Sequence, residues 1–318
     1  MSVEIRDERF MSVVGAEVQF EQIASGFLFT EGPLWHPREH YLLFSDIPGN
    51  RIHRWSSKEG VSTFLEISNM SNGLAWDRAG NLLICEHATS RVTRWHAVSP
   101  ISRSQKSGEN GRSESMVTPM LDRTPQPIAT HFKGKQLNSP NDIVCALNGE
   151  ICFTDPPYGR VEFYGVKREQ ELSFQGVYLS RDPKEPTLLV DDFDRPNGLC
   201  FSLDHRRLFI NDTARQHIRV FDVNSIGTLS GGKVWAETKG EGPGAPDGMK
   251  IDSMGNVYCC GPGGIHVFDP NATCLGVIRV PEYTANFAWG DADFRSLYIT
   301  ASTSVYRIRV KTPGLPSL

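Results

Sequence analysis

The chain has no long apolar run, no basic stripe and no apolar leader, and each of these absences removes a class of protein. No stretch of the 318 residues approaches the roughly 20 apolar residues that are needed to cross a bilayer. The formal net charge is −4, and no cluster of Lys and Arg suggests contact with a nucleic acid. Residues 1–8 contain no apolar segment of the kind found in secretory signals. We therefore expect a cytoplasmic protein that binds neither a membrane nor a nucleic acid.

The cysteines show no spacing typical of a metal site. The chain has seven of them, an odd number, and Cys259 and Cys260 are adjacent within an apolar run. No Cys-x-x-Cys pair occurs with His or Cys partners at zinc spacing. We expect reduced, buried thiols that pack as small hydrophobic residues.

What the chain does contain is a short turn motif that occurs six times. Each copy places one short, oxygen-bearing side chain in a tight turn, usually beside Gly or Pro, and a strand-like run follows it. The copies are Thr30-Glu31-Gly32-Pro33, Ser71-Asn72-Gly73-Leu74, Ser139-Pro140-Asn141-Asp142, Arg195-Pro196-Asn197-Gly198, Ala245-Pro246-Asp247-Gly248-Met249 and Ala285-Asn286-Phe287-Ala288. If the repeats form a ring, the six side chains converge on its axis.

Three further β-rich runs recur in each repeat. The first of them follows the motif side chain by 11 to 13 residues, as in Tyr41–Asp46 and Glu150–Asp155. The others are an alternating run such as His217–Phe221 and a run before the next motif such as Thr187–Val190. No convincing amphipathic helix interrupts them. Four strands per repeat, at a period of roughly 40 to 50 residues, predict an all-β, six-bladed β-propeller with antiparallel blades, and we expect one domain over 1–318.

The ends of the chain predict how the ring closes. The last repeat has only three strands, and an unpartnered strand occurs at Val18–Ile23, before the first motif. This N-terminal strand is expected to complete blade six and remove two exposed sheet edges.

Strand direction assigns the long loops to the two faces of the propeller. In an antiparallel blade, the start of the first strand and the end of the second lie at the same end. The insertion of about 100–124, rich in Ser, Arg, Gly and Glu, is therefore expected as a mobile loop on the opposite face. The loop of about 156–174 is expected on the motif face, where it could cover a pocket.

Four motif side chains predict a cation site. Glu31, Asn141, Asn197 and Asp247 offer two carboxylates and two amide carbonyls, all hard oxygen donors. This set suits Ca²⁺ first, with Mg²⁺, Mn²⁺ or Zn²⁺ as further candidates. The alternative is that such Asn and Asp residues only satisfy turn backbone, as they commonly do. Asn72 and Asn286 complete the ring in supporting or backbone roles.

These motifs resemble those of the senescence marker protein/gluconolactonase (regucalcin-like) family, and its gluconolactonase branch in particular. The likeness extends from about Phe20 to Val310 and excludes 100–124. Its most specific segments are Thr30–Pro33, Leu137–Asp142, Phe153–Gly159, Arg195–Leu199, Asn211–Thr213 and Pro246–Met249. The resemblance implies a six-bladed propeller that holds one divalent metal in its central pocket and hydrolyses sugar lactones.

The resemblance also implies roles for individual residues. The implied metal ligands are Glu31, Asn197 and Asp247, with Asn141 as a fourth ligand or a substrate contact. Asp247 is also the implied acid/base residue, and the competing hypothesis makes it a ligand alone. One departure concerns Ser139: the regucalcin subgroup has an arginine at this position that contacts the sugar. That subgroup's substrate preference is therefore not carried over.

Further candidates lie on the motif face. His87 could assist in substrate binding or proton transfer, or be a structural histidine. Asp155 and Tyr158 could contact substrate hydroxyls, or anchor a Pro-rich loop. Asp46 and Asp212, at strand ends, are expected as turn caps.

The sequence thus predicts a metal-dependent hydrolase that opens sugar lactones to hydroxy acids. The alternatives within enzymes are hydrolases of other esters, phosphotriesters or a specialised-metabolite lactone, because a fold does not fix a substrate. An alternative from another class is a non-catalytic calcium-binding propeller. The oligomeric state is left open.

Overall fold

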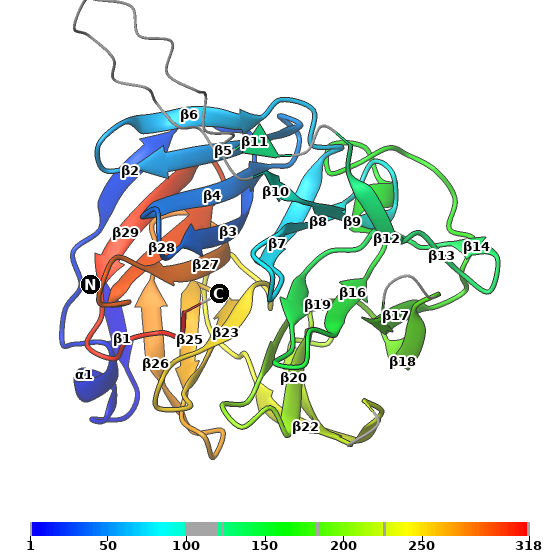
Figure 1. Ribbon diagram of the computed structural model, residues 1–318. Helices are drawn as coiled ribbons and strands as arrows, with labels where there is room; N and C mark the ends of the chain where they lie inside the picture. The colour runs from blue at the N-terminus through cyan, green and yellow to red at the C-terminus, as the bar shows by residue number, and fades with distance from the viewer. Residues whose placement is uncertain (1, 99–119, 122–123, 182–184, 225–226, 317–318) are drawn as a thin grey trace, which may run out of the picture.

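The computed structural model describes residues 2–98, 120–121, 124–181, 185–224 and 227–316. Its strands form six radial sheets that follow one another around a ring, and the colours of Figure 1 run around that ring in chain order. The predicted six-bladed propeller is confirmed. Most of the insertion expected at 100–124 lies outside the described residues.

The first four blades are each built from strands that follow in sequence. Blade one contains β3 (Thr30–His36), β4 (Tyr41–Asp46), β5 (Arg51–Ser56) and β6 (Gly60–Leu65). Blade two contains β7 (Ser71–Trp76), β8 (Leu82–Glu86), β9 (Arg91–Trp95) and β12 (Gln126–Ala129). Blade three contains β15 (Ile143–Cys145), β16 (Ile151–Asp155), β17 (Gln175–Ser180) and β18 (Thr187–Phe193). Blade four contains β19 (Pro196–Phe201), β20 (Arg207–Asp212), β21 (His217–Val223) and β22 (Leu229–Glu237).

The last two blades take strands from the N-terminus. Blade five contains β23 (Met249–Ile251), β24 (Val257–Gly261), β25 (Gly264–Phe268) and β26 (Cys274–Arg279), and β1 (Val3–Ile5) is added outside β26. Blade six contains β27 (Thr284–Gly290), β28 (Ser296–Ala301), β29 (Ser304–Arg309) and β2 (Glu21–Ser25), with β2 antiparallel to β29. Two short hairpins, β10 (Ala97–Val98) with β11 (Met120–Leu121) and β13 (His131–Phe132) with β14 (Lys135–Gln136), extend from the blades.

The ring closes as the sequence predicted, but the strand begins later. Pairing covers Glu21–Ser25 rather than Val18–Ile23. Val18 is buried in the core between blades five and six, and the ring of Phe20 packs edge-on against Tyr306. These two apolar residues are therefore used for packing, while the polar segment that follows them forms the strand.

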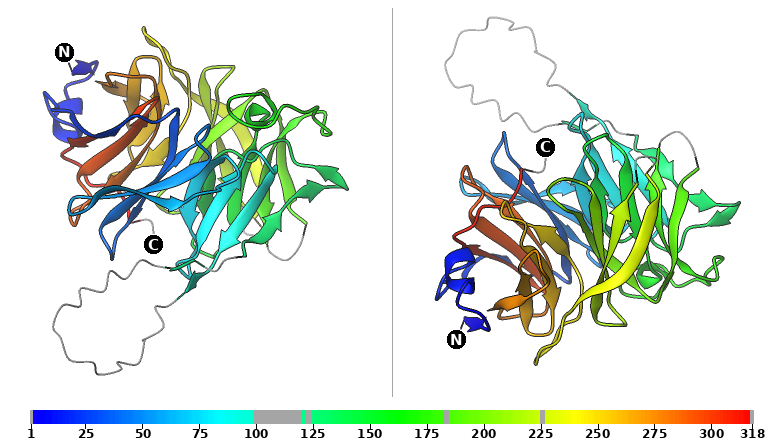
Figure 2. Two further views of the ribbon diagram at one scale, coloured as in Figure 1. Left: turned by 90° about the horizontal axis from the view of Figure 1, so that it is seen from above. Right: turned by 90° about the horizontal axis from the view of Figure 1, so that it is seen from below.

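A short helix and the added strand β1 were not predicted. Helix α1 (Phe10–Val13) and β1 lie together at the outer edge of blade five, and the two views of Figure 2 show them beside β26. The side chain of Phe10 is fully buried there. The helix precedes the recurring strands and does not interrupt them, and one turn is too short to show a helical period in the sequence.

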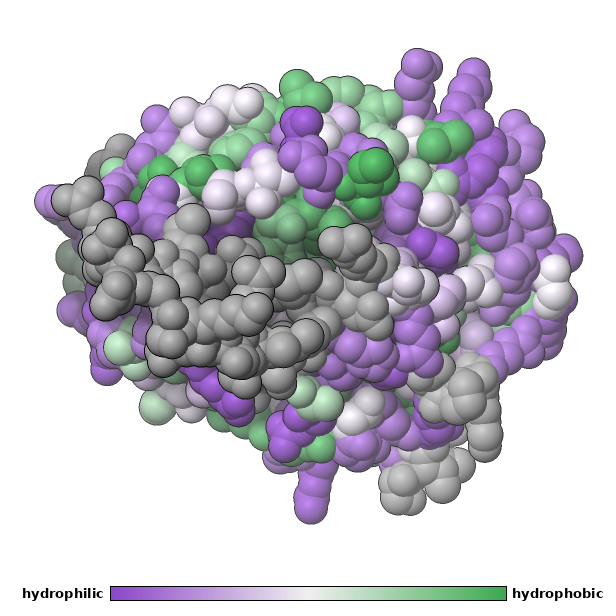
Figure 3. Space-filling view, turned by 45° about the horizontal axis from the view of Figure 1, so that its top comes forward, coloured by the Kyte–Doolittle hydropathy of each residue, from purple (hydrophilic) through white to green (hydrophobic). Residues whose placement is uncertain are grey.

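Burial follows the radius of the propeller. Every residue of β4, β8, β16, β24 and β28, the second strands of five blades, is buried. The outer strand β6 is mostly exposed. Second strands lie between neighbouring blades and are covered on both faces, which explains their continuous apolar runs. On the face seen in Figure 3, hydrophilic residues predominate on the right, and apolar residues gather toward the upper middle.

Among the described residues, no helix is long and apolar enough to span a membrane.

Candidate active site

A cavity of about 260 Å³ lies at the axis of the ring, on the motif face. It is bounded by the turns before the first strands and by the loops after the second strands, the two sets that strand direction places on one face. Its lining residues are Phe29, Glu31, Ile47, Asn72, His87, Asn141, Tyr158, Tyr164, Arg195, Asn197, Thr213, Asp247 and Tyr283. All four predicted metal ligands are among them.

Irregular strand pairing places the motif side chains at the axis. The pairing of the first two strands shifts register between Glu31 and Leu34 in blade one. Equivalent shifts occur between Ser71 and Leu74 in blade two, and between Pro196 and Leu199 in blade four. Such bulges turn a side chain out of the regular alternation of a strand and are common beside active sites. In blades three and five the first strand simply begins two residues after Asn141 and Asp247.

The glycines of the motif allow neighbouring turns to meet. The amide of Gly73 donates to the carbonyl oxygen of Asn141 at 2.8 Å, and a Cβ on Gly73 would lie 2.5 Å from that oxygen. A Cβ on Gly248 would lie 2.1 Å from Cγ of Asn286. Each turn thus packs against the functional residue of the next blade, and any larger side chain would force the ring apart.

Two buried carboxylates form the floor of the cavity. Glu31 is 3% exposed and Asp247 is 9% exposed. Burial raises the pKa of Asp247 well above its ordinary value, and the neighbouring charges of Glu31 and Asp142 raise it further. Burial also raises the pKa of Glu31, as does the charge of Asp142. Two neighbouring buried carboxylates repel each other when both are ionised. They therefore need either a cation between them or a proton that they share.

The second layer of the floor holds Glu31 in place. Oε2 of Glu31 accepts hydrogen bonds from the Gly32 amide at 2.5 Å and from Nδ2 of Asn286 at 3.0 Å. Oδ1 of Asn286 in turn accepts from Nζ of Lys250 at 3.3 Å. Lys250 therefore supplies positive charge behind the acids, and Asn286 supports Glu31 rather than lining the cavity.

The donor set fits a hard divalent cation. Among the residues that the structure describes, no three His, Cys, Asp or Glu side chains gather closely enough to hold a metal ion by themselves. Two carboxylates with the amide oxygens of Asn141 and Asn197 would form a mixed set, and all are hard oxygen donors. Nδ2 of Asn197 donates to Oγ1 of Thr213 at 3.2 Å, which fixes the orientation of that amide.

His87 lies in the cavity wall and uses both ring nitrogens. Nδ1 lies 2.8 Å from the carbonyl oxygen of Tyr164, so it carries the proton, since a carbonyl can only accept. Nε2 lies 3.3 Å from Nδ2 of Asn72 and accepts from it. Burial lowers the pKa of His87 to about 4. The imidazole is neutral near pH 7 and positions the loop of Tyr164.

Asp155 does not line the cavity. Its two carboxylate oxygens accept the backbone amides of Asn138 and Ser139, both at 2.8 Å, and the side chain is fully buried. Burial raises its pKa to about 7. Asp155 anchors the turn that carries Asn141, so the loop-anchor alternative describes it and the expected substrate contact does not.

The loop of 156–174 reaches the cavity through Tyr158 and Tyr164. The loop is held by two arginines: Nε of Arg160 donates to the carbonyl oxygen of Asn138 at 2.7 Å, and Nη2 of Arg168 donates to that of His87 at 2.8 Å. Tyr158 itself lies in a short 3₁₀ turn, Tyr158–Arg160.

Several lining residues were not predicted from sequence. Phe29 and Tyr283 precede the motifs of blades one and six, Arg195 opens the motif of blade four, and Ile47 and Thr213 follow strand-end residues. Their only sequence signal is their position next to a motif. The expected caps were correct: Asp46 accepts the amide of Phe29 at 3.0 Å, and Asp212 accepts that of Asp194 at 2.9 Å.

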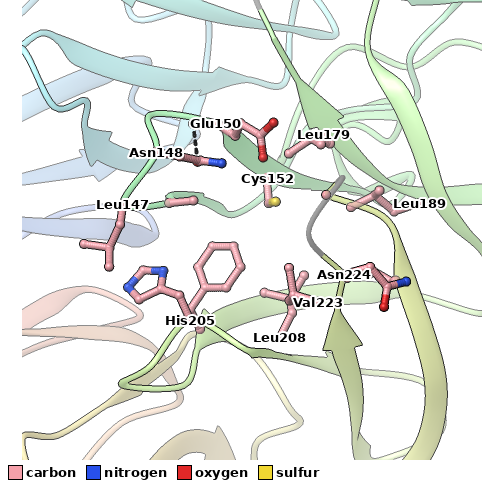
Figure 4. Close-up of a pocket in the computed structure, with 14 residues that line it drawn as sticks. Leu147, Asn148, Glu150, Cys152, Leu179, Leu189, His205, Leu208, Val223 and Asn224 are labelled. Atoms are coloured by element: carbon pink, nitrogen blue, oxygen red, sulfur yellow. Dashed lines mark hydrogen bonds between the residues drawn. The ribbon is translucent and has the colours of Figure 1, made fainter.

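A second cavity, of about 200 Å³, lies between blades three and four near the opposite face (Figure 4). Its walls are mainly aliphatic, and Leu179, Leu189 and Leu208 point into it. Burial raises the pKa of Cys152 to about 12, so its thiol stays protonated. The carboxylate of Glu150 is bound by Arg181. The axial cavity, where several polar groups converge, is the candidate active site.

The chain is similar to known proteins over most of its length. The family model described as SMP-30/Gluconolactonase/LRE-like region matches residues 29–303. The chain is 30% identical to a gluconolactonase of Zymomonas mobilis, over 96% of this chain and 85% of the relative. It is 28% identical to the pentonolactonase XacC of Haloferax volcanii, over 86% of this chain and 81% of the relative.

A solved structure extends the likeness to three dimensions. A gluconolactonase from Xanthomonas campestris superimposes with a TM-score of 0.83 at 26% identity, over 98% of this chain and 95% of that chain. The superposition covers nearly the whole chain. The chain belongs to the SMP-30/gluconolactonase family.

Proposed function

We propose that the axial cavity binds a sugar lactone and hydrolyses it to the open-chain hydroxy acid. Hydrolysis of lactones as a class follows from family membership and from the gluconolactonase and pentonolactonase relatives. The single observation that carries the assignment to this cavity is the pair of buried acids, Glu31 and Asp247, beside the amides of Asn141 and Asn197.

We propose that these four residues hold one divalent cation, with Ca²⁺ as the expected ion. The raised pKa values of the two acids support this, because a cation relieves their mutual repulsion. When bound, such a cation polarises the lactone carbonyl and stabilises the negative charge that develops on its oxygen.

The protein's own groups supply positioning and proton transfer. In our proposal Asp247 accepts a proton from the attacking water as the water oxygen bonds to the carbonyl carbon. The bond from that carbon to the ring oxygen then breaks, and the proton passes from Asp247 to the ring oxygen. A sugar lactone is an activated ester, so a weak base suffices. A hydrogen bond from Asn197 offsets part of the rise that burial causes in the pKa of Asp247.

The walls of the cavity suit a ring with an apolar face and several hydroxyls. Phe29 packs edge-on against Tyr164, with ring centroids 5.1 Å apart, and lies 6.2 Å from the ring of Tyr283. Tyr158 and Thr213 add hydroxyl groups to the lining. Aromatic faces with a few placed polar groups are typical of small-molecule sites.

Position 139 takes no part in this wall. Oγ of Ser139 accepts from the Gly159 amide at 2.8 Å and donates to the carbonyl oxygen of Pro156 at 2.5 Å. Ser139 is fully buried beneath the Tyr158 loop. The arginine contact of the regucalcin subgroup has no counterpart at this residue, so substrate preference must come from other groups.

We propose a reducing cellular compartment, in keeping with a cytoplasmic enzyme. All seven cysteines are free, and five of them are buried in the core.

Acid release from a panel of aldonolactones tests the proposed function. We expect turnover by the intact chain and a loss of at least tenfold in Glu31→Gln, which removes one of the two acids. Glu66→Gln is the control, because Glu66 is an exposed carboxylate that pairs with Arg51 on the surface, away from the cavity lining. The proposal fails if no lactone is opened above the spontaneous rate, or if the two variants behave alike.

A further inference from the structure

One cationic side chain lies at the rim of the axial cavity. Arg195 is the only Arg or Lys among its described lining residues, and it is exposed whereas Glu31 and Asp247 below it are buried. Its backbone amide donates to Oδ1 of Asp212 at 3.2 Å, which fixes the point from which the side chain extends. Asn197, a proposed ligand of the cation, follows two residues later.

The guanidinium of Arg195 has no polar partner in the described part of the chain. Its side chain makes one contact with a ring, at 6.0 Å from the centroid of Tyr158, which also lines the cavity. This distance is at the outer limit of a cation–π interaction, so the contact guides the side chain without occupying its N–H donors.

Neighbouring arginines on the same face are engaged with the protein. Arg160 and Arg168 donate to backbone carbonyls and hold the Tyr158 loop. Arg215, in the turn after β20, donates to the carbonyl oxygen of Asp192 at 2.7 Å and lies 3.4 Å from the carboxylate of Asp212. Arg195 differs from these three because its guanidinium makes no hydrogen bond or ion pair with the described residues.

Arg195 makes no ion pair with the acids on the cavity floor. Lys250 already lies behind them and reaches Glu31 through Asn286. The positive charge of Arg195 is therefore available to a ligand that enters the cavity.

A guanidinium presents five N–H donors in a planar fork that matches the two oxygens of a carboxylate or a phosphate. We propose that Arg195 selects lactones that carry an anionic group on the end of the molecule remote from the reacting carbonyl. This inference rests on the proposed function, and it names the substrate class within it. The carbonyl would lie over Asp247 and Glu31, and the anionic end would point toward the rim beside Tyr158.

Three δ-lactones that differ only at C6 test this inference: glucono-δ-lactone, its 6-phosphate, and the glucaro-δ-lactone, which has a carboxylate there. We expect the intact chain to have a higher kcat/KM for at least one anionic lactone than for the neutral one. Arg195→Gln should lower the ratio of anionic to neutral kcat/KM by about tenfold, mainly through KM, as loss of a charge-assisted hydrogen bond at a partly exposed site would. Arg195→Lys should retain part of the ratio, because it keeps the charge but not the fork.

Arg215→Gln is the matched control, since it removes an arginine from the neighbouring β20–β21 turn of the same blade, where the side chain is engaged with the protein, and the ratio should not change. The phosphate and carboxylate lactones show which anion the rim accepts. The inference is overturned if the intact chain shows no preference, or if Arg195→Gln lowers kcat/KM equally for all three lactones.

A failure of the proposed function can be told apart from a failure of this inference. If no lactone is hydrolysed, the proposed function is wrong, and calorimetric binding of 6-phosphogluconate then decides the inference alone. We expect binding that is about tenfold weaker in Arg195→Gln than in Arg215→Gln, and equal affinities would overturn the role of Arg195.

Discussion

Replacing Asn286 with leucine should weaken cation binding without unfolding the propeller. Asn286 is 2% exposed, and its Nδ2 is one of two donors to Oε2 of Glu31, at 3.0 Å. Leucine removes this donor and also leaves Nζ of Lys250 without its acceptor. Glu31 is then free to rotate away from Asp247, and its ionised form loses support.

The expected magnitude follows from the type of bond that is lost. A hydrogen bond to a charged group contributes about 1.5–3 kcal/mol, and each 1.4 kcal/mol is a factor of ten in affinity. The affinity for Ca²⁺ should therefore fall by roughly 10- to 100-fold, which is also the range found for residues that orient metal ligands. Gly248→Ala should act in the same direction, because its Cβ would lie 2.1 Å from Cγ of Asn286 and would displace that amide.

Calorimetric titration of chelator-stripped protein with Ca²⁺ measures this effect. Asn256→Leu is the matched control, since Asn256 is also buried and donates to a carboxylate, that of Asp252, at 2.7 Å, but it does not line the cavity. Both variants lose a buried hydrogen bond, and only Asn286→Leu should lose affinity. Equal affinity in Asn286→Leu and the intact chain, or an equal loss in both variants, would refute the reasoning.

Three further predictions concern chemistry and stability. Asp247→Asn, measured at saturating cation, should lose about 10²–10⁴-fold in kcat because the amide cannot accept a proton, whereas near-normal turnover would make Asp247 a ligand alone. Phe10→Ala should lower the free energy of unfolding by about 3–5 kcal/mol, because the ring is fully buried against blade five. Met11 lies in the same helix but is 41% exposed, so Met11→Ala should change the free energy of unfolding by less than about 0.5 kcal/mol. Equal melting temperatures of the two variants would contradict a stabilising role for the packing of Phe10 against blade five. Burial lowers the pKa of His266 to about 4, below the ordinary value of 6.5, so the unfolded chain takes up the proton first. The contribution of His266 to the free energy of unfolding should be complete above about pH 6.5 and should be lost as the pH falls toward 4. In His266→Gln the free energy of unfolding should change less between these two pH values, and an unchanged pH dependence would contradict the role of His266.

The repeat and its chemistry could be predicted from sequence because they are local. Each motif is a tight turn that needs Gly or Pro, and each second strand is an apolar run covered on both faces, as in Leu82–Glu86. Constant spacing between the two implies a ring, and a ring brings Glu31, Asn141, Asn197 and Asp247 to one axis. None of this depended on contacts between distant side chains.

What could not be predicted depends on such contacts. The bulge after Glu31 and the packing of neighbouring turns are set by tertiary structure, and no local preference reveals them. Asp155, the last residue of β16, binds two amides of a segment 16 and 17 residues earlier, and the residues next to it in sequence do not reveal that contact. Helix α1 has too few residues for a periodic pattern, and its place is fixed by Phe10 against blade five.

The most direct test of the proposed function combines acid release with metal analysis. Glucono-δ-lactone is supplied at constant pH to protein as purified, to protein stripped by a chelator, and to stripped protein reloaded with Ca²⁺, and bound metal is measured in each sample. We predict that activity falls with bound cation and returns when one equivalent is restored. Full activity in protein shown to be free of metal would contradict the proposed cation site, and no activity in the loaded protein would contradict lactone hydrolysis in the axial cavity.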